Sequence, residues 1–230
     1  MNRLRRRIEE RSGHTFARIE LFEQALTHRS YAGEHGVGHN ERLEFLGDAA
    51  LGLACAYWLC DRFPDLPEGR LARRKSYLVS WQVLAALARD LELGEALRLG
   101  FGEEQSGGRD KDSLLADAME AVLGVLFLDG GLEPLQRLLS DFFEERLIAQ
   151  PSLEGQDAKT RLQEFQQARG AALPVYRVLS STGPDHAKEF MVECLVDGQR
   201  RGVGSGGSKK KAELAAALSA LEELPADAAG

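Results

Sequence analysis

The sequence predicts a chain of two domains: an all-helical domain over residues 1–149 and an α-β-β-β-α domain over residues 157–225. Three observations predict this division. Apolar residues of the first part recur at intervals of three and four, which is typical of helices. Residues 150–156 have the composition of a linker. Beyond them, apolar residues alternate with other residues in the manner of strands.

The first 148 residues carry the helical pattern almost throughout. Glycine and proline clusters at 63–67 and 100–108 interrupt it and predict the connections between helices. No clear strand pattern is present in this part. The two patterns that matter most for function have apolar residues at Leu43, Leu46, Ala50 and Leu53, and at Leu115, Met119, Val122 and Leu126.

The second part changes its periodicity after residue 169. A helix is predicted over 159–169, followed by strands over 175–179 and 190–196 and by a short strand near 200–204. A closing helix follows. Its apolar seam consists of Ala212, Ala215, Ala216 and Leu218.

Composition is that of an ordinary globular protein, with 43% hydrophobic and 28% charged residues among 230. The net charge of −7 argues against a chain that coats nucleic acid by bulk charge. Three cysteines without a pairing pattern predict a reducing compartment. The basic N-terminus precedes no apolar run, and no stretch approaches the ~20 apolar residues of a membrane span. We therefore expect a cytoplasmic protein with no membrane association.

An acidic stripe lies on the helix that begins near residue 41. At about 100° per residue, Glu44 and Asp48 fall within about 60° of Glu41. The apolar residues Leu43 and Ala50 occupy the opposite side, so one face is acidic and the other is predicted to face the core.

Asp117 and Glu120 form a second acidic pair, because residues three apart share a helix face. Each single carboxylate is explained well by a solvated helix surface. The set is harder to explain in that way, since like charges at these spacings repel and no lysine interrupts the first stripe. A divalent cation offsets that repulsion. Carboxylate oxygens suit Mg²⁺, and the lack of suitably placed Cys or His disfavours zinc.

Phe45 lies at about +40° on the same helix, beside the acidic stripe and away from the predicted core side. A large aromatic side chain at this position needs cover. Another helix of the same domain and a partner subunit both provide it, and the sequence leaves these two interpretations open.

The C-terminal helix begins with positive charge. Ser208 is a predicted N-cap, which places Lys209, Lys210 and Lys211 in the first turn beside free backbone N–H groups. This arrangement can hold phosphate. Polar residues of the helix before the sheet can reach ribose hydroxyls in a shallow minor groove; they are Thr160, Gln163 and Glu164. Acidic residues that can hold a metal and basic residues that can hold a polyanion together predict a metal-dependent enzyme acting on nucleic acid.

Two sets of motifs resemble a known family. The block Asn40-Glu41-Arg42-Leu43-Glu44-Phe45-Leu46-Gly47-Asp48, with Leu115-Ala116-Asp117 and Glu120-Ala121 downstream, is similar to the ribonuclease III family. The second part resembles a double-stranded RNA-binding domain. The residues that carry this resemblance are Lys159-Thr160, Leu162-Gln163-Glu164, Gly204, Gly206, Ser208-Lys209-Lys210 and Ala212-Glu213.

The resemblance implies a homodimeric endoribonuclease that hydrolyses double-stranded RNA with Mg²⁺, Mn²⁺ being able to substitute, and without an organic cofactor. It implies 5′-phosphate and 3′-hydroxyl ends, short 3′ overhangs, and a role in rRNA and mRNA processing and decay. Metal ligands by motif position are Glu44, Asp48, Asp117 and Glu120, with Asp48 and Glu120 closest to the chemistry. Glu41 matches a position for substrate and subunit contacts, and Phe45 an aromatic residue that plugs the opposite subunit. RNA-contact positions are Thr160, Gln163, Glu164, His186, Lys209 and Lys210.

Two other functions are less consistent with these residues. An RNA binder that has lost cutting activity would not need all four metal-site carboxylates. A di-iron carboxylate bundle would use Glu-x-x-His pairs, and none of Glu41, Glu44 and Glu120 has a histidine three residues on.

Overall fold

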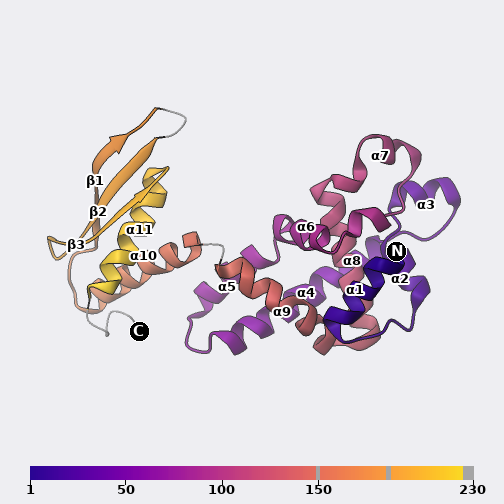
Figure 1. Cartoon of the computed structure of the whole chain (residues 1–230). Coiled ribbons are helices and arrows are strands. Elements are labelled where there is room, and N and C mark those ends of the chain that lie inside the picture. Colours follow the sequence, from indigo (N-terminus) through magenta and orange to yellow (C-terminus); the bar gives the residue numbers. More distant parts are fainter. Residues whose placement is uncertain (149–150, 185–187, 225–230) are drawn as a thin grey trace. The chain divides into compact units, whose positions relative to one another are not determined.

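The computed structural model describes residues 1–148, 151–184 and 188–224, with only the backbone described over 151–157. The chain divides into two compact units, Met1–Ile148 and Ala149–Gly230 (Figure 1). The first unit contains α1 (Asn2–Ser12), α2 (Ile19–Ala25), α3 (Arg29–His35), α4 (Glu41–Arg62), α5 (Glu68–Leu78), α6 (Trp81–Asp90), η1 (Leu93–Ala96), α7 (Phe101–Gln105), η2 (Gly108–Asp110), α8 (Asp112–Gly130) and α9 (Leu132–Ile148). The second contains α10 (Pro151–Ala168), β1 (Val175–Thr182), β2 (Glu189–Val196), β3 (Gln199–Gly206) and α11 (Lys209–Glu222).

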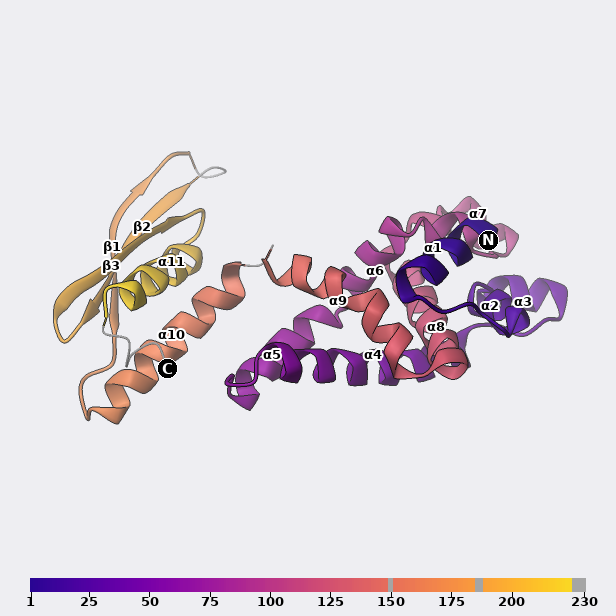
Figure 2. The same cartoon turned by 60° about the horizontal axis from the view of Figure 1, so that its bottom comes forward.

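Helix α8 is the centre of the first unit and packs against α2, α4, α6 and α9 (Figure 2). Its predicted apolar side is confirmed, because Leu115, Met119, Val122 and Leu126 are all at most 2% exposed. A helix buried on most of its circumference is expected to be apolar nearly all round, which describes the sequence from Leu114 to Leu128 apart from two carboxylates.

The predicted core side of α4 was partly wrong. Leu43 and Ala50 are buried, but Leu53 is 52% exposed and Leu46 is only half-buried. The buried line instead runs through Leu43, Gly47, Ala50, Leu51 and Ala54, because α8 contacts α4 along this line. One apolar side of α4 is therefore left uncovered by the described residues of its own unit.

By length and composition alone, α4 is the one helix among the described residues that could cross a membrane, with a mean hydropathy of 1.3. This corrects the expectation that no stretch approaches that limit. Core helices of globular proteins have the same composition, and α4 supplies much of the core of its unit. The apolar character of α4 therefore does not indicate a membrane span.

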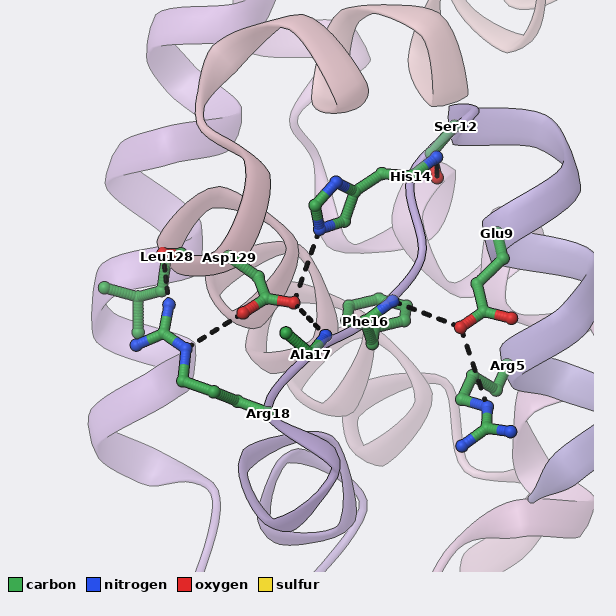
Figure 3. A network of polar contacts seen from close by, with 9 residues as sticks. All are labelled: Arg5, Glu9, Ser12, His14, Phe16, Ala17, Arg18, Leu128 and Asp129. Carbon is green, nitrogen blue, oxygen red and sulfur yellow. Dashed lines mark hydrogen bonds and ion pairs between the residues drawn. The ribbon is translucent and has the colours of Figure 1, made fainter.

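The C-terminal end of α8 is fixed by Asp129 (Figure 3). Its carboxylate accepts hydrogen bonds from the backbone N–H of Ala17 at 2.6 Å and from Nε of Arg18 at 2.9 Å, and lies 3.3 Å from Nε2 of His14. Burial by itself would raise the pKa of Asp129, but these hydrogen bonds hold it below its usual range. The network ties the connection between α1 and α2 to α8.

In the second unit, three antiparallel strands form a sheet in the order β1-β2-β3, and α10 and α11 cover one face (Figures 1 and 2). Phe190, Val192, Cys194 and Val196 face these helices, which confirms the predicted alternation. The α-β-β-β-α order is also confirmed.

The predicted linker was wrong in part, because α10 already begins at Pro151. Proline is favoured in the first turn of a helix, where its missing N–H has no partner to lose. The prediction of a linker from composition alone makes no allowance for this position of proline. His186 lies outside the described residues, between β1 and β2.

Candidate active site and RNA-binding surface

The acidic residues are brought together by direct backbone contact between α4 and α8. A Cβ atom added at Gly47 would lie 1.8 Å from the carbonyl oxygen of Glu120, and one added at Gly124 would lie 2.4 Å from the carbonyl oxygen of Leu43. Only glycine permits so close an approach. Glu44 lies about one helical turn before Gly47 and Asp48 directly follows it, so this crossing places them beside the acidic residues of α8.

The four carboxylates share one electrostatic environment. Burial, together with the neighbouring carboxylates of Asp48, Glu44 and Asp117, raises the pKa of Glu120 to about 7. Burial likewise raises the pKa of Glu44, assisted by Asp117 and Glu41. Burial also raises the pKa of Asp117, against an opposing effect of His28. Crowding of like charges in a partly buried position is typical of functional sites.

The carboxylates are not arranged as a closed cage. Among the described residues, no group of three or more His, Cys, Asp or Glu side chains is placed to hold a metal ion. The donor set is nevertheless the one that hard divalent cations prefer, since it consists of carboxylates alone. Burial and neighbouring carboxylates raise the pKa of both Glu44 and Glu120, so positive charge beside them would stabilise their ionised forms. The donor set therefore fits a hard cation by its chemistry.

A cavity of about 480 Å³ opens beside this site. It brings together part of the predicted acidic set with residues from the α2–α3 connection and from the segment before α7. Its lining consists of His28, Arg29, Asn40, Glu41, Glu44, Leu97, Leu99, Ser113, Leu114 and Asp117. Asp48 and Glu120 do not contribute to this lining. Glu41 is exposed, and its carboxylate lies 3.8 Å from Arg29 and 3.7 Å from His39.

His28 is a cavity residue that the sequence reasoning did not assign to the site. A sequence signal was present, because the stretch Leu26-Thr27-His28-Arg29-Ser30-Tyr31 also resembles bacterial members of the ribonuclease III family. Its contribution depends on a contact between distant segments: the backbone N–H of His28 donates to the carbonyl of Arg98 at 3.0 Å. Periodicity along one segment cannot predict such a pairing.

Phe45 is 80% exposed on α4. One of the two interpretations is thereby removed, because no described helix of the chain covers the ring. Leu53 and Tyr57, on the same helix, are 52% and 55% exposed. Together with Phe45 they form the uncovered apolar side of α4, which we call the α4 apolar stripe. Several large apolar side chains exposed on one helix indicate an interaction site.

The second unit presents its predicted phosphate-binding turn. Ser208 is the N-cap of α11, and its Oγ accepts a hydrogen bond from the backbone N–H of Lys211 at 3.2 Å, as predicted. Lys209 and Lys210 are exposed in the first turn. Glycines of β3 let that strand lie directly on α11, since a Cβ at Gly204 would be 2.2 Å from the backbone N of Ala216.

The predicted RNA-facing residues of α10 lie on its outer side. Gln163 and Glu164 are exposed and Thr160 is half-buried, whereas Leu162 is fully buried in the core of this unit. Lys159 ties α10 to α11 through an ion pair with Glu213 at 2.6 Å. The polar side of α10 and the lysines of α11 thus belong to two helices that pack against each other.

Comparison with known proteins identifies both units. Residues 18–149 match the family model described as ribonuclease-III-like, and residues 158–224 match the double-stranded RNA binding motif. The fold and site therefore define an endoribonuclease that binds double-stranded RNA.

The relatives agree over nearly the whole chain. A ribonuclease 3 of Magnetococcus marinus is 46% identical over 95% of this chain and 92% of its own length. One of Vibrio atlanticus is 47% identical over 95% and 96%, respectively. The chain belongs to the ribonuclease III family. Among solved structures, the nuclease domain of ribonuclease III from Campylobacter jejuni is 35% identical to this chain, with a TM-score of 0.55. The match covers 60% of this chain and 94% of the Campylobacter jejuni chain.

Proposed function

We propose that this endoribonuclease hydrolyses double-stranded RNA with Mg²⁺, for which Mn²⁺ substitutes, and needs no organic cofactor. Residues 1–149 form the nuclease domain, and residues 157–225 bind the duplex. The observation that carries the proposal is the backbone contact between α4 and α8 at Gly47, which gathers carboxylates of both helices in one partly buried site.

The site residues have distinct roles in this proposal. Glu44, Asp48, Asp117 and Glu120 hold the cation, with Asp48 and Glu120 nearest to the reacting phosphate. When bound, the cation stabilises negative charge on the phosphate and leaving oxygens and lowers the pKa of water. Without a cation, burial and the neighbouring carboxylates raise the pKa of Glu120 to about 7, and a bound cation would lower it by stabilising the ionised form.

The second unit supplies binding more than sequence selection. Lys209 and Lys210 contact phosphates, and Thr160, Gln163 and Glu164 face the minor groove, where ribose hydroxyls are displayed. His186 belongs to the same proposed set by motif position. Attachment of this unit to the nuclease unit raises the effective concentration of duplex at the carboxylates.

We also propose that the protein is a homodimer in which the α4 apolar stripe meets the partner subunit. The exposure of Phe45, Leu53 and Tyr57 supports this assignment. The description of the Campylobacter jejuni nuclease domain concerns a region involved in dimer formation. The products carry 5′-phosphate and 3′-hydroxyl ends with short 3′ overhangs, and the protein acts in the cytoplasm on rRNA and mRNA.

A digestion of long duplex RNA tests the catalytic proposal. Cutting is expected with Mg²⁺ or Mn²⁺, and not with EDTA or Ca²⁺. Glu120→Ala should abolish cutting while its affinity for the duplex stays near normal, because the lysines lie in the other unit. Product ends are identified by their labelling with and without phosphatase. Loss of both cutting and binding in Glu120→Ala would assign this residue a structural role instead.

The dimer is tested by sedimentation of Phe45→Ala. A shift toward monomer is expected, since an exposed aromatic ring loses its contact with the partner. Trp81→Ala, which removes another ring that is about half exposed on α6, is the matched control and should sediment as the parent does. An unchanged dimer in Phe45→Ala would remove Phe45 from the interface.

A further inference from the structure

The imidazole of His28 is held in one orientation with one defined tautomer. Its Nδ1 accepts a hydrogen bond from the backbone N–H of Ser30 at 3.2 Å and lies 2.8 Å from Ser30 Oγ. That hydroxyl oxygen accepts from the backbone N–H of Gly100 at 2.9 Å, so its own proton is free to donate to Nδ1. Nδ1 is therefore an acceptor, and the neutral ring carries its proton on Nε2.

The backbone that carries this ring is also fixed. The N–H of His28 donates to Arg98 O at 3.0 Å, and its carbonyl accepts from the N–H of Ala32 at 3.1 Å. Arg98 in turn donates its N–H to Leu26 O at 2.8 Å. Among the described residues none hydrogen-bonds to Nε2, so this N–H is a preorganised donor at the cavity wall.

The charges around the cavity decide which ligand group suits that donor. Glu41, Glu44 and Asp117 contribute carboxylates to the lining, and Arg29 is its one cationic side chain. Burial lowers the pKa of His28, and Arg29 lowers it further, against the opposing carboxylates of Glu103 and Asp117. The cavity therefore offers a neutral hydrogen-bond donor beside anionic acceptors. This arrangement disfavours a phosphate group as the ligand of His28.

A hydroxyl group matches this arrangement, because it both accepts and donates one hydrogen bond. The carboxylate of Glu41 is a suitable acceptor, since its nearest cationic partners stand at 3.7 and 3.8 Å, beyond hydrogen-bond distance. In an RNA duplex, the hydroxyls that are accessible to a protein in the minor groove are the ribose 2′-hydroxyls.

We propose that His28 donates its Nε2–H to a ribose 2′-hydroxyl of the strand bound in this cavity, and that the hydroxyl donates to Glu41. The inference rests on the proposed function of the neighbouring carboxylates and extends it. The nuclease unit itself then distinguishes RNA from DNA, independently of the RNA-binding unit. His28 is on this view a specificity-determining residue that contacts substrate.

Two conservative variants separate this contact from the role of His28 in the fold. His28→Asn keeps an oxygen near the position of Nδ1 and remains a good N-cap for α3, but lacks the Nε2 arm. His28→Gln retains an N–H donor near the position of Nε2. Each variant is compared with the parent on short duplexes that carry a single 2′-fluoro substitution, moved through the nucleotides around the cleavage site.

For the parent, 2′-fluoro at one nucleotide should lower kcat/KM about tenfold or more, because the bond from His28 and the bond to the Glu41 carboxylate are both weakened or lost. In His28→Asn the unmodified duplex should be cut about threefold to tenfold more slowly, and the same 2′-fluoro group should have a smaller effect than in the parent, limited to the loss of the bond to Glu41. His28→Gln should recover part of the sensitivity. Substitutions at remote nucleotides should act equally on all three proteins.

Equal sensitivity of the parent and His28→Asn at every nucleotide would overturn the proposal, as would a parent that is insensitive throughout. Thermal unfolding of each variant shows whether the fold is retained. The same comparison is made on dissociation constants of the full-length protein without Mg²⁺. If the parent binds duplex RNA but does not cut it, the proposed function fails, and coupling between His28 and the 2′-hydroxyl is still decided by the binding data.

Discussion

The two functional surfaces of this molecule are built in the same way and differ in what they do to charge. In the helical unit, Gly47 lets α4 touch α8; in the second unit, Gly204 lets β3 touch α11. Both contacts bring backbones closer than any side chain allows. The first leaves carboxylates crowded and partly buried, with the pKa of Glu120 raised to about 7. The second leaves Lys209 and Lys210 exposed to solvent.

The difference suits the chemistry that we propose for each surface. Carboxylates that hold a cation need to be close to one another, so the fold supplies the energy that keeps like charges together. Lysines that bind phosphates gain most from an open position, because each releases counterions from the duplex as it binds. Close backbone packing therefore brings negative charges together in the helical unit and leaves positive charges exposed in the second unit.

The largest expected effect is that of Gly47→Ala. Its Cβ would lie 1.8 Å from the carbonyl oxygen of Glu120 and must separate α4 from α8. We expect the free energy of unfolding of the helical unit to fall by more than about 3 kcal/mol, at the upper end of overpacking costs. Chemical denaturation measures it. Gly33→Ala is the matched control, since no atom lies within 4 Å of the added group on α3; a control as damaging as Gly47→Ala would contradict the argument.

Gly204→Ala should damage the second unit alone. The added Cβ would lie 2.2 Å from the backbone N of Ala216, so β3 and α11 must move apart. A loss of about 3 kcal/mol is expected in the unfolding of this unit. Duplex affinity should fall with it, while the helical unit unfolds as before. Unchanged RNA binding would show that β3 and α11 do not need this contact to form the RNA surface.

Much of this comparison was predictable from the sequence. Helical spacing alone placed Glu41, Glu44 and Asp48 on one stripe, and Ser208 as a helix cap was correctly predicted from its residue type. Periodicity describes one element at a time, however. It did not show which side of α4 meets α8, and Leu53 was wrongly assigned to the core.

Glycine was the most informative residue that the sequence reasoning did not use. Gly47 and Gly124 mark the helix crossing, but a glycine in a helix indicates a close contact only once its partner is known. The start of α10 at Pro151 was missed for a related reason. Proline in the interior of a helix breaks it, whereas proline in the first turn favours the helix. His28 entered the site through pairing with Arg98, a contact between residues far apart in sequence.

Removal of the exposed lysine charges of α11 should weaken the binding of duplex RNA, and the size of the loss should depend on salt concentration. Lys209→Gln together with Lys210→Gln should weaken duplex binding about tenfold or more at moderate salt. The slope of log affinity against log salt should fall by about two, one for each phosphate contact. Fluorescence anisotropy across a salt series measures both quantities. Arg6→Gln combined with Arg11→Gln, two exposed charges on α1, provides the control. An unchanged slope in the lysine variant would place the phosphate contacts elsewhere.

The smallest expected effect concerns the crowded carboxylates of the helical unit. It is a dependence of stability on pH that the exposed lysines of the second unit should not produce. Glu120 has a pKa of about 7 in the folded protein, against an ordinary value of 4.5. Between these pH values the folded state binds more protons than the unfolded state, so stability falls as pH rises from about 4.5 to 7. Glu120→Gln removes this loss because glutamine stays neutral.

In metal-free buffer at pH 8, Glu120→Gln should therefore be more stable than the parent by about 1–2 kcal/mol, a value reduced for the partial solvent exposure of the site. The gain should shrink steadily as the pH falls and be absent near pH 4, where both side chains are neutral. Glu145→Gln on α9, away from the acidic site, is the control and should show no such trend. A stabilisation of Glu120→Gln that is equal at all pH values would show that glutamine packs better, and that like-charge crowding does not destabilise the α4–α8 crossing.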